Sequence, residues 1–314
     1  MLQTIIKALM KRSRLLIRNE QGQIVALAAF SMVFLIGMIG LVVDIGFVYK
    51  AKSDLKKSAT TAALSASQEL TNGEPARVQS VVNTVLASYN EQSSMENTEI
   101  ELNQQVRVSL TKEVPFAFAK IFGMEGTTIR ETAAAKIFPI GSLYGAIPLG
   151  VDESTPITYG QTISLKVGAG DSGSGNFGVL ALAGTGAKTY LETLKYGFDQ
   201  ALSVGDIVPT QTGNIAGSTK EGINYRINHC PNPGGDPTVR ECARILPIIV
   251  YKPYQSSSNQ LQSIKVTGFA FFYLQQPMNT NDTAVIGTFI KRVDTGTFKT
   301  GSVDRGAYMS RLVE

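Results

Sequence analysis

Residues 170–173 are the first of several Gly-rich stretches whose residue types could do chemistry. The run Gly-Asp-Ser-Gly resembles the surroundings of a serine nucleophile, and His229, next to Cys230, is the chain's single histidine. A hydrolase would use such a histidine to take the proton of Ser172. The serine precedes the histidine here, however, which is the reverse of the chymotrypsin order, and serine in a Gly-rich turn is typical of a loop. The pattern therefore predicts a turn between strands.

Two further patterns suggest a metal site and a phosphate site, and both are incomplete. Residues 171–175 resemble the D-x-S-x-S metal motif of von Willebrand A domains, but Gly173 and Gly175 stand where that motif needs hydroxyls. Residues 184–189 resemble a phosphate-binding loop, but Ala187 stands where a Walker A motif has glycine before its lysine. Two cysteines and one histidine also exclude a Cys/His zinc cluster from one chain. We therefore predict no cofactor, no metal and no enzymatic activity.

The elements of the chain are organised around one apolar stretch, residues 24–43, with the sequence IVALAAFSMVFLIGMIGLVV. These residues carry no charge, and as a helix they would measure about 30 Å, the thickness of bilayer hydrocarbon. A single apolar run crosses a membrane as a helix because every backbone N–H group must be bonded internally. The run is longer than the core of a typical signal peptide, and no A-x-A-like site follows it closely. We therefore predict a retained anchor.

Charges beside the apolar stretch predict its orientation. Five cations precede it within residues 1–23, and four lysines follow it within residues 50–57, with Asp54 among them. The positive-inside rule narrowly places the N-terminus in the cytoplasm, and the large C-terminal part with its cysteine pair favours the same direction. We expect a single-pass inner-membrane protein whose bulk is periplasmic or extracellular. The net charge of +4 is too mild to indicate a nucleic-acid partner.

Three residues of the expected span suggest contacts. Gly37 and Gly40 are small enough to let another helix approach, although their spacing is one residue short of a GxxxG motif. Asp44 ends the apolar stretch, and a carboxylate at such a place is costly unless it is hydrated or paired. We expect Asp44 to face water at the membrane surface or to contact a cation of a partner.

The helix is expected to continue beyond the membrane as a stalk. Residues 49–70 contain no proline or glycine, and Ala59, Ala62 and Ala66 belong to a stripe at three- and four-residue spacing. A stripe of alanines packs closely but buries little area per residue. It predicts an assembly surface, with self-association through the N-terminal helix as one use. The helix is expected to end near 72–73, where Asn-Gly forms a natural cap.

Composition divides the rest of the chain into two regions. Residues 73–140 contain a helical window, an alternating strand at 105–110, a short apolar helix at 115–122 and an extended segment from 127, which predicts a small α/β unit. Residues 141–314 contain 23 of the 30 glycines and 9 of the 12 prolines, with short alternating runs between turns. This second region predicts a mostly antiparallel β sandwich or barrel, so the fold class is α+β.

The predicted division of the chain has five parts. They are a basic cytoplasmic tail at 1–23, a transmembrane helix at 24–48, a helical stalk at 49–72, the α/β unit at 73–140 and the Gly-rich β domain at 141–314. The strands expected in the β domain are 162–167, 179–182, 245–251, 264–274 and 284–293, with one helix at 189–202. Cys230 and Cys242 bracket a turn-rich segment, and a disulfide there would contribute about 3 kcal/mol in an oxidising compartment.

Residues 19–70 resemble the N-terminal segment of the TadE/TadG-like Flp-pilus assembly proteins. The resemblance is carried by Glu20-x-Gly22, Val43-Asp44-Ile45-Gly46, the spacing of Tyr49, Lys52 and Leu55, and Ala62-Ala63-Leu64-x-Ala66. Downstream, Val114-Pro115-Phe116, residues 118–123 and the alanines at 133–135 also resemble these proteins. The resemblance implies a non-enzymatic, inner-membrane component of the tight-adherence secretion system, which assembles Flp pili for surface attachment and biofilm formation.

Two departures refine what the resemblance implies. TadE-like members are pseudopilins cut by a prepilin peptidase, with glutamate at the fifth mature position. After Gly22 the fifth residue is Leu27, so the chain is closer to the uncleaved TadG-like type. Some TadG-like proteins carry a von Willebrand A domain, and the incomplete metal motif at 171–175 indicates that this chain does not.

Four functions follow as hypotheses. The first is a scaffold or anchor of the pilus machinery, with the membrane, other pilus-assembly proteins and the pilin as its partners. The second is a minor pilin-like subunit of the fibre. The third is a surface adhesin whose β domain binds a ligand, and the fourth is a hydrolase using Ser172 and His229.

Overall fold

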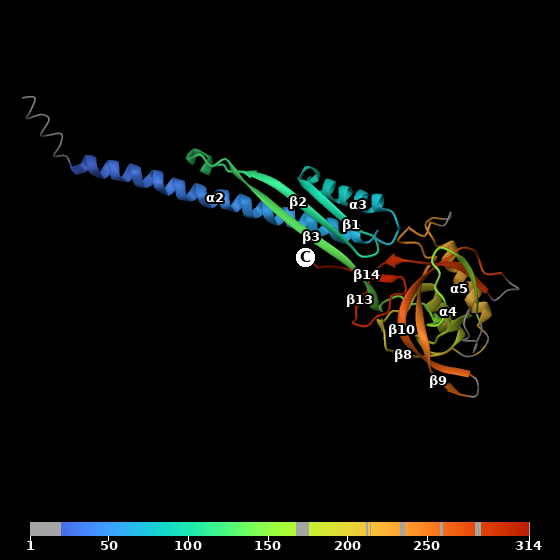
Figure 1. Cartoon of the computed structure of the whole chain (residues 1–314). Helices are drawn as coiled ribbons and strands as arrows, with labels where there is room; N and C mark the ends of the chain where they lie inside the picture. Colours follow the sequence, from blue (N-terminus) through green and yellow to red (C-terminus); the bar gives the residue numbers. More distant parts are fainter. Residues whose placement is uncertain are drawn as a thin grey trace, which may run out of the picture. The chain divides into compact units, whose positions relative to one another are not determined.

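The protein is described from a computed structural model. The structure describes residues 20–167, 176–211, 213, 215–232, 236–257, 260–279 and 284–313. Over these residues the fold is α+β, as predicted, with a long N-terminal helix, shorter helices and two curled, mostly antiparallel sheets (Figure 1). The chain forms two compact units. The first unit comprises Met1–Lys57 and Leu110–Glu131, and the second comprises Ser58–Ser109 and Thr132–Glu314.

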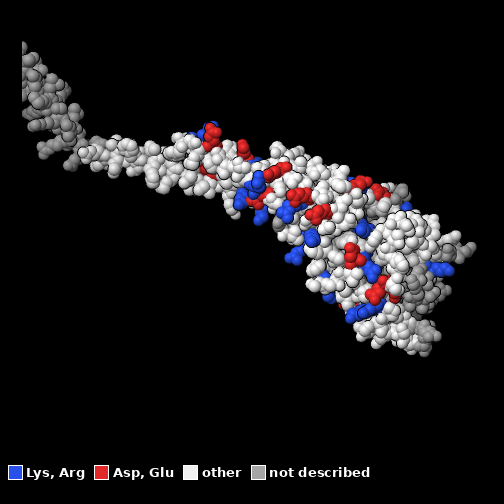
Figure 2. Space-filling model, viewed as in Figure 1, with Lys and Arg blue, Asp and Glu red and all other residues white. Residues whose placement is uncertain are grey.

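The long helix is α2, Glu20–Ser67, and it begins in the first unit and ends in the second. In the described part of the chain it is the one helix that is long and apolar enough to cross a membrane. Figure 2 shows no charged side chain over its described start. Of the predicted basic tail, 1–23, residues 1–19 lie outside the described residues. The predicted stalk is confirmed as helix, although it ends at Ser67, and the chain then turns to Gly73, where φ is +75°.

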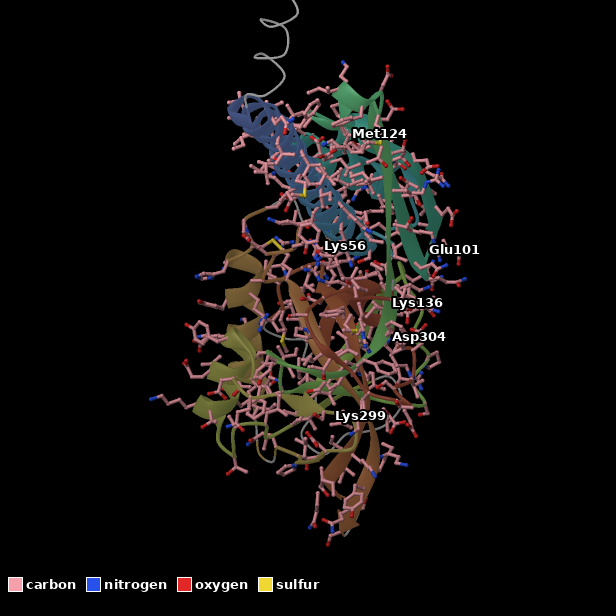
Figure 3. The ribbon with its side chains drawn as sticks, turned by 90° about the vertical axis from the view of Figure 1, so that its left-hand side faces the viewer. Lys56, Glu101, Met124, Lys136, Lys299 and Asp304 are labelled. Atoms are coloured by element: carbon pink, nitrogen blue, oxygen red, sulfur yellow. A yellow bond between two sulfur atoms is a disulfide. The ribbon has the colours of Figure 1, made fainter. Side chains whose placement is uncertain are left out.

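The first unit also contains the tip of a hairpin formed by β2 and β3. Strand β2 is Gln105–Pro115, β3 is Gly126–Leu143, and the 3₁₀ helix η2, Ala119–Phe122, lies between them. Gly123 ends η2 with φ +84°, a left-handed conformation that favours glycine. The short helix expected at 115–122 is therefore present in a shorter form, because Pro115 still belongs to β2. Figure 3 shows Met124 at the free end of this hairpin.

The first sheet continues in the second unit with strands from widely separated parts of the sequence. Its order is β1-β2-β3-β14-β12, and β13 and β7 also pair with β3. The added strands are β1 Met95–Glu101, β7 Leu202–Ser203, β12 Arg292–Val293, β13 Thr297–Phe298 and β14 Ala307–Leu312. Strand β14 pairs antiparallel with β3 from Tyr308↔Pro139 to Leu312↔Ala135. The predicted boundary at 140–141 therefore falls inside β3, and the two predicted regions share one sheet.

The helix predicted after the stalk is confirmed as α3, Pro75–Ser88. Pro75 stands in its first turn, where a missing N–H group costs nothing, and Val78, Val82 and Leu86 are buried on one face. The 3₁₀ helix η1, Gln92–Ser94, then leads into β1.

The second sheet forms a ring. Its order is β11-β5-β6-β4-β9-β10-β8, and β11 also pairs with β10, so the strands from β11 to β10 close on themselves. These strands are β4 Leu149–Asp152, β5 Thr162–Val167, β6 Asn176–Val179, β8 Ile207–Pro209, β9 Ile245–Ser257, β10 Gln260–Leu274 and β11 Ala284–Ile290. The pairs β5–β6 and β4–β9 are parallel, and the other described pairs of this sheet are antiparallel. The barrel alternative of the prediction is thus the better description.

Both faces of the β9–β10 pair are buried. Phe272 on one face joins a core that includes Tyr190 of α4, Ala187–Tyr196, and Ile223 of α5, Ala216–Asn228. Phe271 on the other face joins a core that includes both cysteines and residues of β3 and β14. A helix is present within the predicted window 189–202 as α4, but it ends at Tyr196 and Leu202 belongs to β7. The helix α5 was not predicted. Its window contains two glycines and few apolar residues, and Gly222 is required because a Cβ there would lie 2.6 Å from Leu194.

Candidate functional site

Asp44 is a buried charged residue in an apolar helix, because it is only 2% exposed. Its carboxylate accepts hydrogen bonds from three successive backbone N–H groups of the hairpin tip. The Oδ1 atom lies 2.7 Å from the nitrogen of Ala117, and Oδ2 lies 3.0 Å from that of Phe118 and 2.7 Å from that of Ala119. Charge-assisted bonds of this kind are stronger than neutral ones. Asp44 therefore caps the start of η2 and does not face water, contrary to one of its two expected roles.

Gly40 and Gly37 make room for the same tip. A Cβ atom at Gly40 would lie 2.6 Å from the Cβ of Phe118, so α2 and the tip approach too closely for a side chain there. A Cβ at Gly37 would lie 3.7 Å from the ring of Phe122. We name the set formed by Gly37, Gly40, Asp44 and residues 116–124 the Asp44 junction. The two glycines thus serve contacts within the chain, and their use by another helix stays a prediction.

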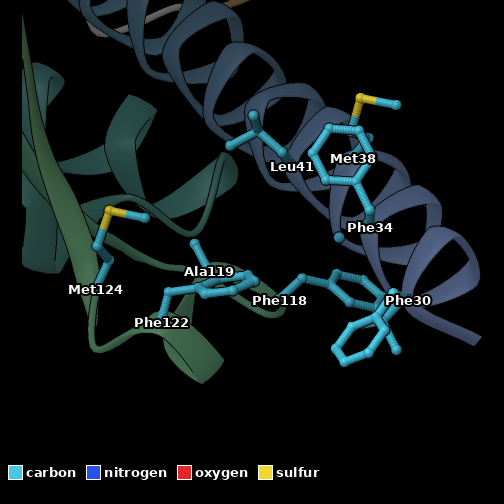
Figure 4. Close-up of a pocket in the computed structure, with 10 residues that line it drawn as sticks. Phe30, Phe34, Met38, Leu41, Phe118, Ala119, Phe122 and Met124 are labelled. Carbon is cyan, nitrogen blue, oxygen red and sulfur yellow. The ribbon is translucent and has the colours of Figure 1, made fainter. Parts of the chain in front are cut away.

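An open apolar groove lies beside the Asp44 junction, with a volume of about 600 Å³. Figure 4 shows Phe30, Phe34, Met38 and Leu41 of α2 on one side of it. Phe118, Ala119, Phe122 and Met124 of the tip form the other side. The groove has no charged lining residue, so it suits an apolar ligand or an apolar surrounding and not an ion or a polar substrate.

The alanine stripe lies in the second unit and is covered by the chain itself. Ala59, Ala62 and Ala66 are each 0% exposed, and so is Leu70 in the turn that follows α2. The carbonyl of Leu70 accepts a hydrogen bond of 3.0 Å from Asn103, which ties this turn to the β1–β2 connection. The stripe thus supplies close packing inside the protein. Because these alanines are buried, they are not exposed to a partner in this structure. Their contact with a partner protein stays a prediction.

The cysteines form the expected disulfide, with their Cα atoms 4.5 Å apart. Close to it, Arg226 of α5 is almost fully buried, and burial lowers the pKa of its guanidinium to about 10. Its Nε donates to the carbonyl of Leu194, and its Nη1 donates to the carbonyl of Ala243 at 3.2 Å. Arg226 therefore joins the end of α4 to the segment before β9, and its role is structural.

The residues that could have formed a catalytic pair are only partly described. Ser172 and the metal-like motif at 171–175 lie outside the described residues. His229 is exposed at the end of α5, where its ring stacks on Tyr225 with a centroid distance of 3.8 Å. The phosphate-like loop at 184–189 leads into α4, and Gly186 donates its N–H to Gln211 at 3.2 Å. In the described loop at 184–189 this hydrogen bond connects the start of α4 to Gln211.

A polar pocket of about 440 Å³ lies in the second unit. Arg244, Tyr273, Gln275 and Thr288 are among its lining residues. Gln275 donates to the hydroxyl of Thr288 at 2.8 Å, and the buried hydroxyl of Tyr273 has no hydrogen-bond partner among the described residues. No feature of the sequence indicated this pocket, because its lining residues include members of β10, of β11 and of the segment before β9, which are separate in the sequence.

Comparison with known proteins bears on the N-terminal segment of the chain. The family model of Flp pilus-assembly TadE/G-like proteins matches residues 22–69. The matched segment coincides with α2 and the start of the turn after it, so the resemblance found in the sequence is confirmed for this segment. No curated protein and no solved structure matches the chain. The match supports a part in Flp pilus assembly.

Proposed function

We propose that this protein is a non-enzymatic, membrane-anchored component of Flp pilus assembly that scaffolds or anchors the pilus machinery. The observation that carries the proposal is the coincidence of the family match with α2. In the proposal, the exposed apolar start of α2 sits in the inner membrane with the N-terminus in the cytoplasm. The second unit is then periplasmic or extracellular, where its disulfide is stable.

Two features of α2 support an anchor that also organises the protein. Its start presents large apolar side chains such as Phe30, which is 79% exposed, whereas the alanines of its last turns are buried. Exposure of such large apolar side chains is unfavourable in water and favourable in bilayer hydrocarbon. The last turns of the same helix are buried inside the second unit. A single helix thus connects the proposed span with the folded part of the chain.

The proposal is tested by a clean deletion of the gene in its host. We expect fewer surface pili, measured by shearing the cells and quantifying the pilin released, and we expect the full-length chain supplied in trans to restore them. Normal piliation in the deletion strain would contradict the proposal. The Ser172→Ala variant should restore piliation as well as the unaltered chain does, since no catalytic serine is needed.

A minor pilin-like subunit is the first alternative, and it predicts a different N-terminus. N-terminal sequencing of the protein from membranes should find the unprocessed chain if it is a scaffold. Cleavage after Gly22 together with recovery in the sheared pilus fraction would favour the pilin-like subunit. Leu27 at the fifth position after Gly22 supports the unprocessed form.

A surface adhesin is the second alternative, and the polar pocket of the second unit favours it. An adhesin would use Arg244 and Tyr273 to bind a ligand, so Arg244→Ala should abolish surface attachment while piliation stays normal. The exposed Arg311 of β14 provides a matched control, Arg311→Ala. Normal attachment by Arg244→Ala cells would count against the adhesin.

A further inference from the structure

The hairpin tip between β2 and β3 carries large apolar side chains that the protein leaves uncovered. Ile121 is 80% exposed and Phe122 is 70% exposed, and Phe118 and Met124 are also exposed. These four residues fall within a stretch of seven, so the tip presents a contiguous apolar surface. A surface of this kind marks a place that contacts lipid or protein and does not face water.

The Asp44 junction sets the level of this tip along α2. The tip meets α2 at Asp44, Gly40 and Gly37, and the last two lie inside the apolar stretch 24–43. Gly37 is seven residues from Asp44, which corresponds to about 10 Å along a helix. Phe122, which packs beside Gly37, therefore lies well below the polar end of the stretch. Wherever this part of α2 enters hydrocarbon, the tip must enter with it.

The backbone of the tip is prepared for an apolar surrounding. Non-helical backbone is tolerated at membrane depth only where its polar groups are satisfied. Asp44 bonds the N–H groups of residues 117–119. The N–H groups of Phe116, Ile121, Gly123 and Met124 bond to backbone carbonyls of the tip itself. The buried carboxylate of Asp44 thus supplies the acceptor that these N–H groups would otherwise lack in an apolar surrounding.

We propose that the β2–β3 tip dips into the bilayer beside α2 and that lipid acyl chains fill the apolar groove between them. Phe30 and Phe34, which line the groove on α2, are themselves exposed apolar side chains of the expected span, so the surrounding that covers this part of α2 also fills the groove. Lys120 is the cation of η2, and its long side chain can reach the headgroup region while its stem stays in apolar surroundings. The inference rests on the membrane anchoring in the proposed function.

Tryptophan fluorescence tests the proposal directly, because the chain contains no tryptophan. The full chain is reconstituted into vesicles of phosphatidylcholine and phosphatidylglycerol whose acyl chains carry bromine, a quencher. Ile121→Trp reports on the tip and Phe34→Trp on α2. Tyr254→Trp, at an exposed position of β9, is the control. Each variant is also titrated with aqueous iodide.

The proposal expects Ile121→Trp and Phe34→Trp to lose roughly half of their emission to brominated lipid, with a blue-shifted maximum, as for side chains at the acyl boundary. Tyr254→Trp should be quenched by iodide alone. If brominated lipid quenches Phe34→Trp but only iodide quenches Ile121→Trp, the proposed insertion of the tip is overturned and the membrane anchor is retained. Protection of Ile121→Trp from both quenchers would also overturn it, in favour of a second copy or another protein. An unquenched Phe34→Trp would overturn both the tip insertion and the anchor.

Discussion

The two units differ in how far their large apolar side chains are exposed. In the first unit, Phe34 and Phe122 are about as exposed as side chains on a surface, with 67% and 70% of their area accessible. In the second unit, Phe272 and Phe289 are fully buried and pack edge to face, with ring centroids 5.2 Å apart. The second unit therefore completes its own core, as a protein in water must. In the first unit the large apolar side chains of α2 and of the tip stay exposed, and in the proposed function a bilayer covers them.

The units also differ in what holds their distant segments together. In the first unit, one carboxylate on α2 bonds backbone N–H groups more than seventy residues away, and a glycine lets the two segments meet. In the second unit, a ring of paired strands, a disulfide and two apolar cores act together. A single substitution should therefore open the tip locally, whereas the second unit should unfold as a whole.

The largest effect is expected from the disulfide of the second unit. Replacing both Cys230 and Cys242 with serine should lower its free energy of unfolding by about 3 kcal/mol, since the unfolded chain is no longer constrained. Urea unfolding followed by proteolysis in detergent measures the change. Cleavage at the tip of the first unit should stay the same. An unchanged urea midpoint for the second unit would show that the disulfide contributes little.

The next effect is expected at Asp44 and should be confined to the first unit. Asp44→Ala leaves three N–H groups of the tip without their acceptor, at a cost of about 2 kcal/mol. Trypsin cleavage after Lys120 should accelerate by roughly thirtyfold, because cleavage follows the open population. Asp54→Ala is the matched control, since Asp54 forms an exposed pair with Lys50 on the same helix. Equal cleavage rates in the two variants would remove Asp44 from its capping role.

A smaller effect separates two glycines of α2. A Cβ at Gly40 meets Phe118, so Gly40→Ala should loosen the tip at a cost of about 1 kcal/mol. Nothing lies within 4 Å of a Cβ at Gly46, so Gly46→Ala should be neutral or slightly stabilising. Hydrogen exchange of the amides at 117–119 measures the difference. Faster exchange in both variants, or in neither, would contradict the close approach at Gly40.

The smallest effect at neutral pH is expected from the buried tyrosines of the second unit. Their effect on its stability should become larger in alkali. Burial raises the pKa of the Tyr190, Tyr251 and Tyr308 phenols, and Tyr308 also donates to Asp304, labelled in Figure 3. The unfolded chain loses these protons near pH 10, before the folded chain does, so stability should be constant below that pH and fall above it.

Thermal unfolding across this pH range measures the loss. Tyr190→Phe should cost about 1 kcal/mol at pH 8, where it removes the 3.0 Å hydrogen bond to Thr219, and should weaken the dependence above pH 10. An unfolding temperature that does not change between pH 9 and 11 would contradict the effect of buried phenols.

Local sequence signals predicted much of the fold. Strand β5 was predicted with its observed bounds, and the apolar stretch with its alanine-rich continuation indicated α2. The helix α5 was missed because its stability comes from packing: Arg226 and Gly222 fit it against Leu194, and its two glycines lower its helix propensity. The boundary at 140–141 followed a change in composition. The backbone of β3 continues through it because β14 supplies a pairing partner from the end of the chain.

The candidate site shows the same limit. Asp44 was recognisable as an unusual residue because a carboxylate in an apolar helix is costly unless it is hydrated or paired. Its partners were not recognisable, since backbone N–H groups have no sequence signature and the tip lies far away along the chain. The disulfide was predictable because its cysteines are the only two in the sequence.

Alkaline carbonate extraction of host membranes tests the central claim, that the apolar start of α2 is completed by a bilayer. Carbonate removes peripheral proteins and leaves spanning ones in the membrane. The full-length protein should stay in the membrane pellet. Release of the intact protein into the supernatant would contradict the account.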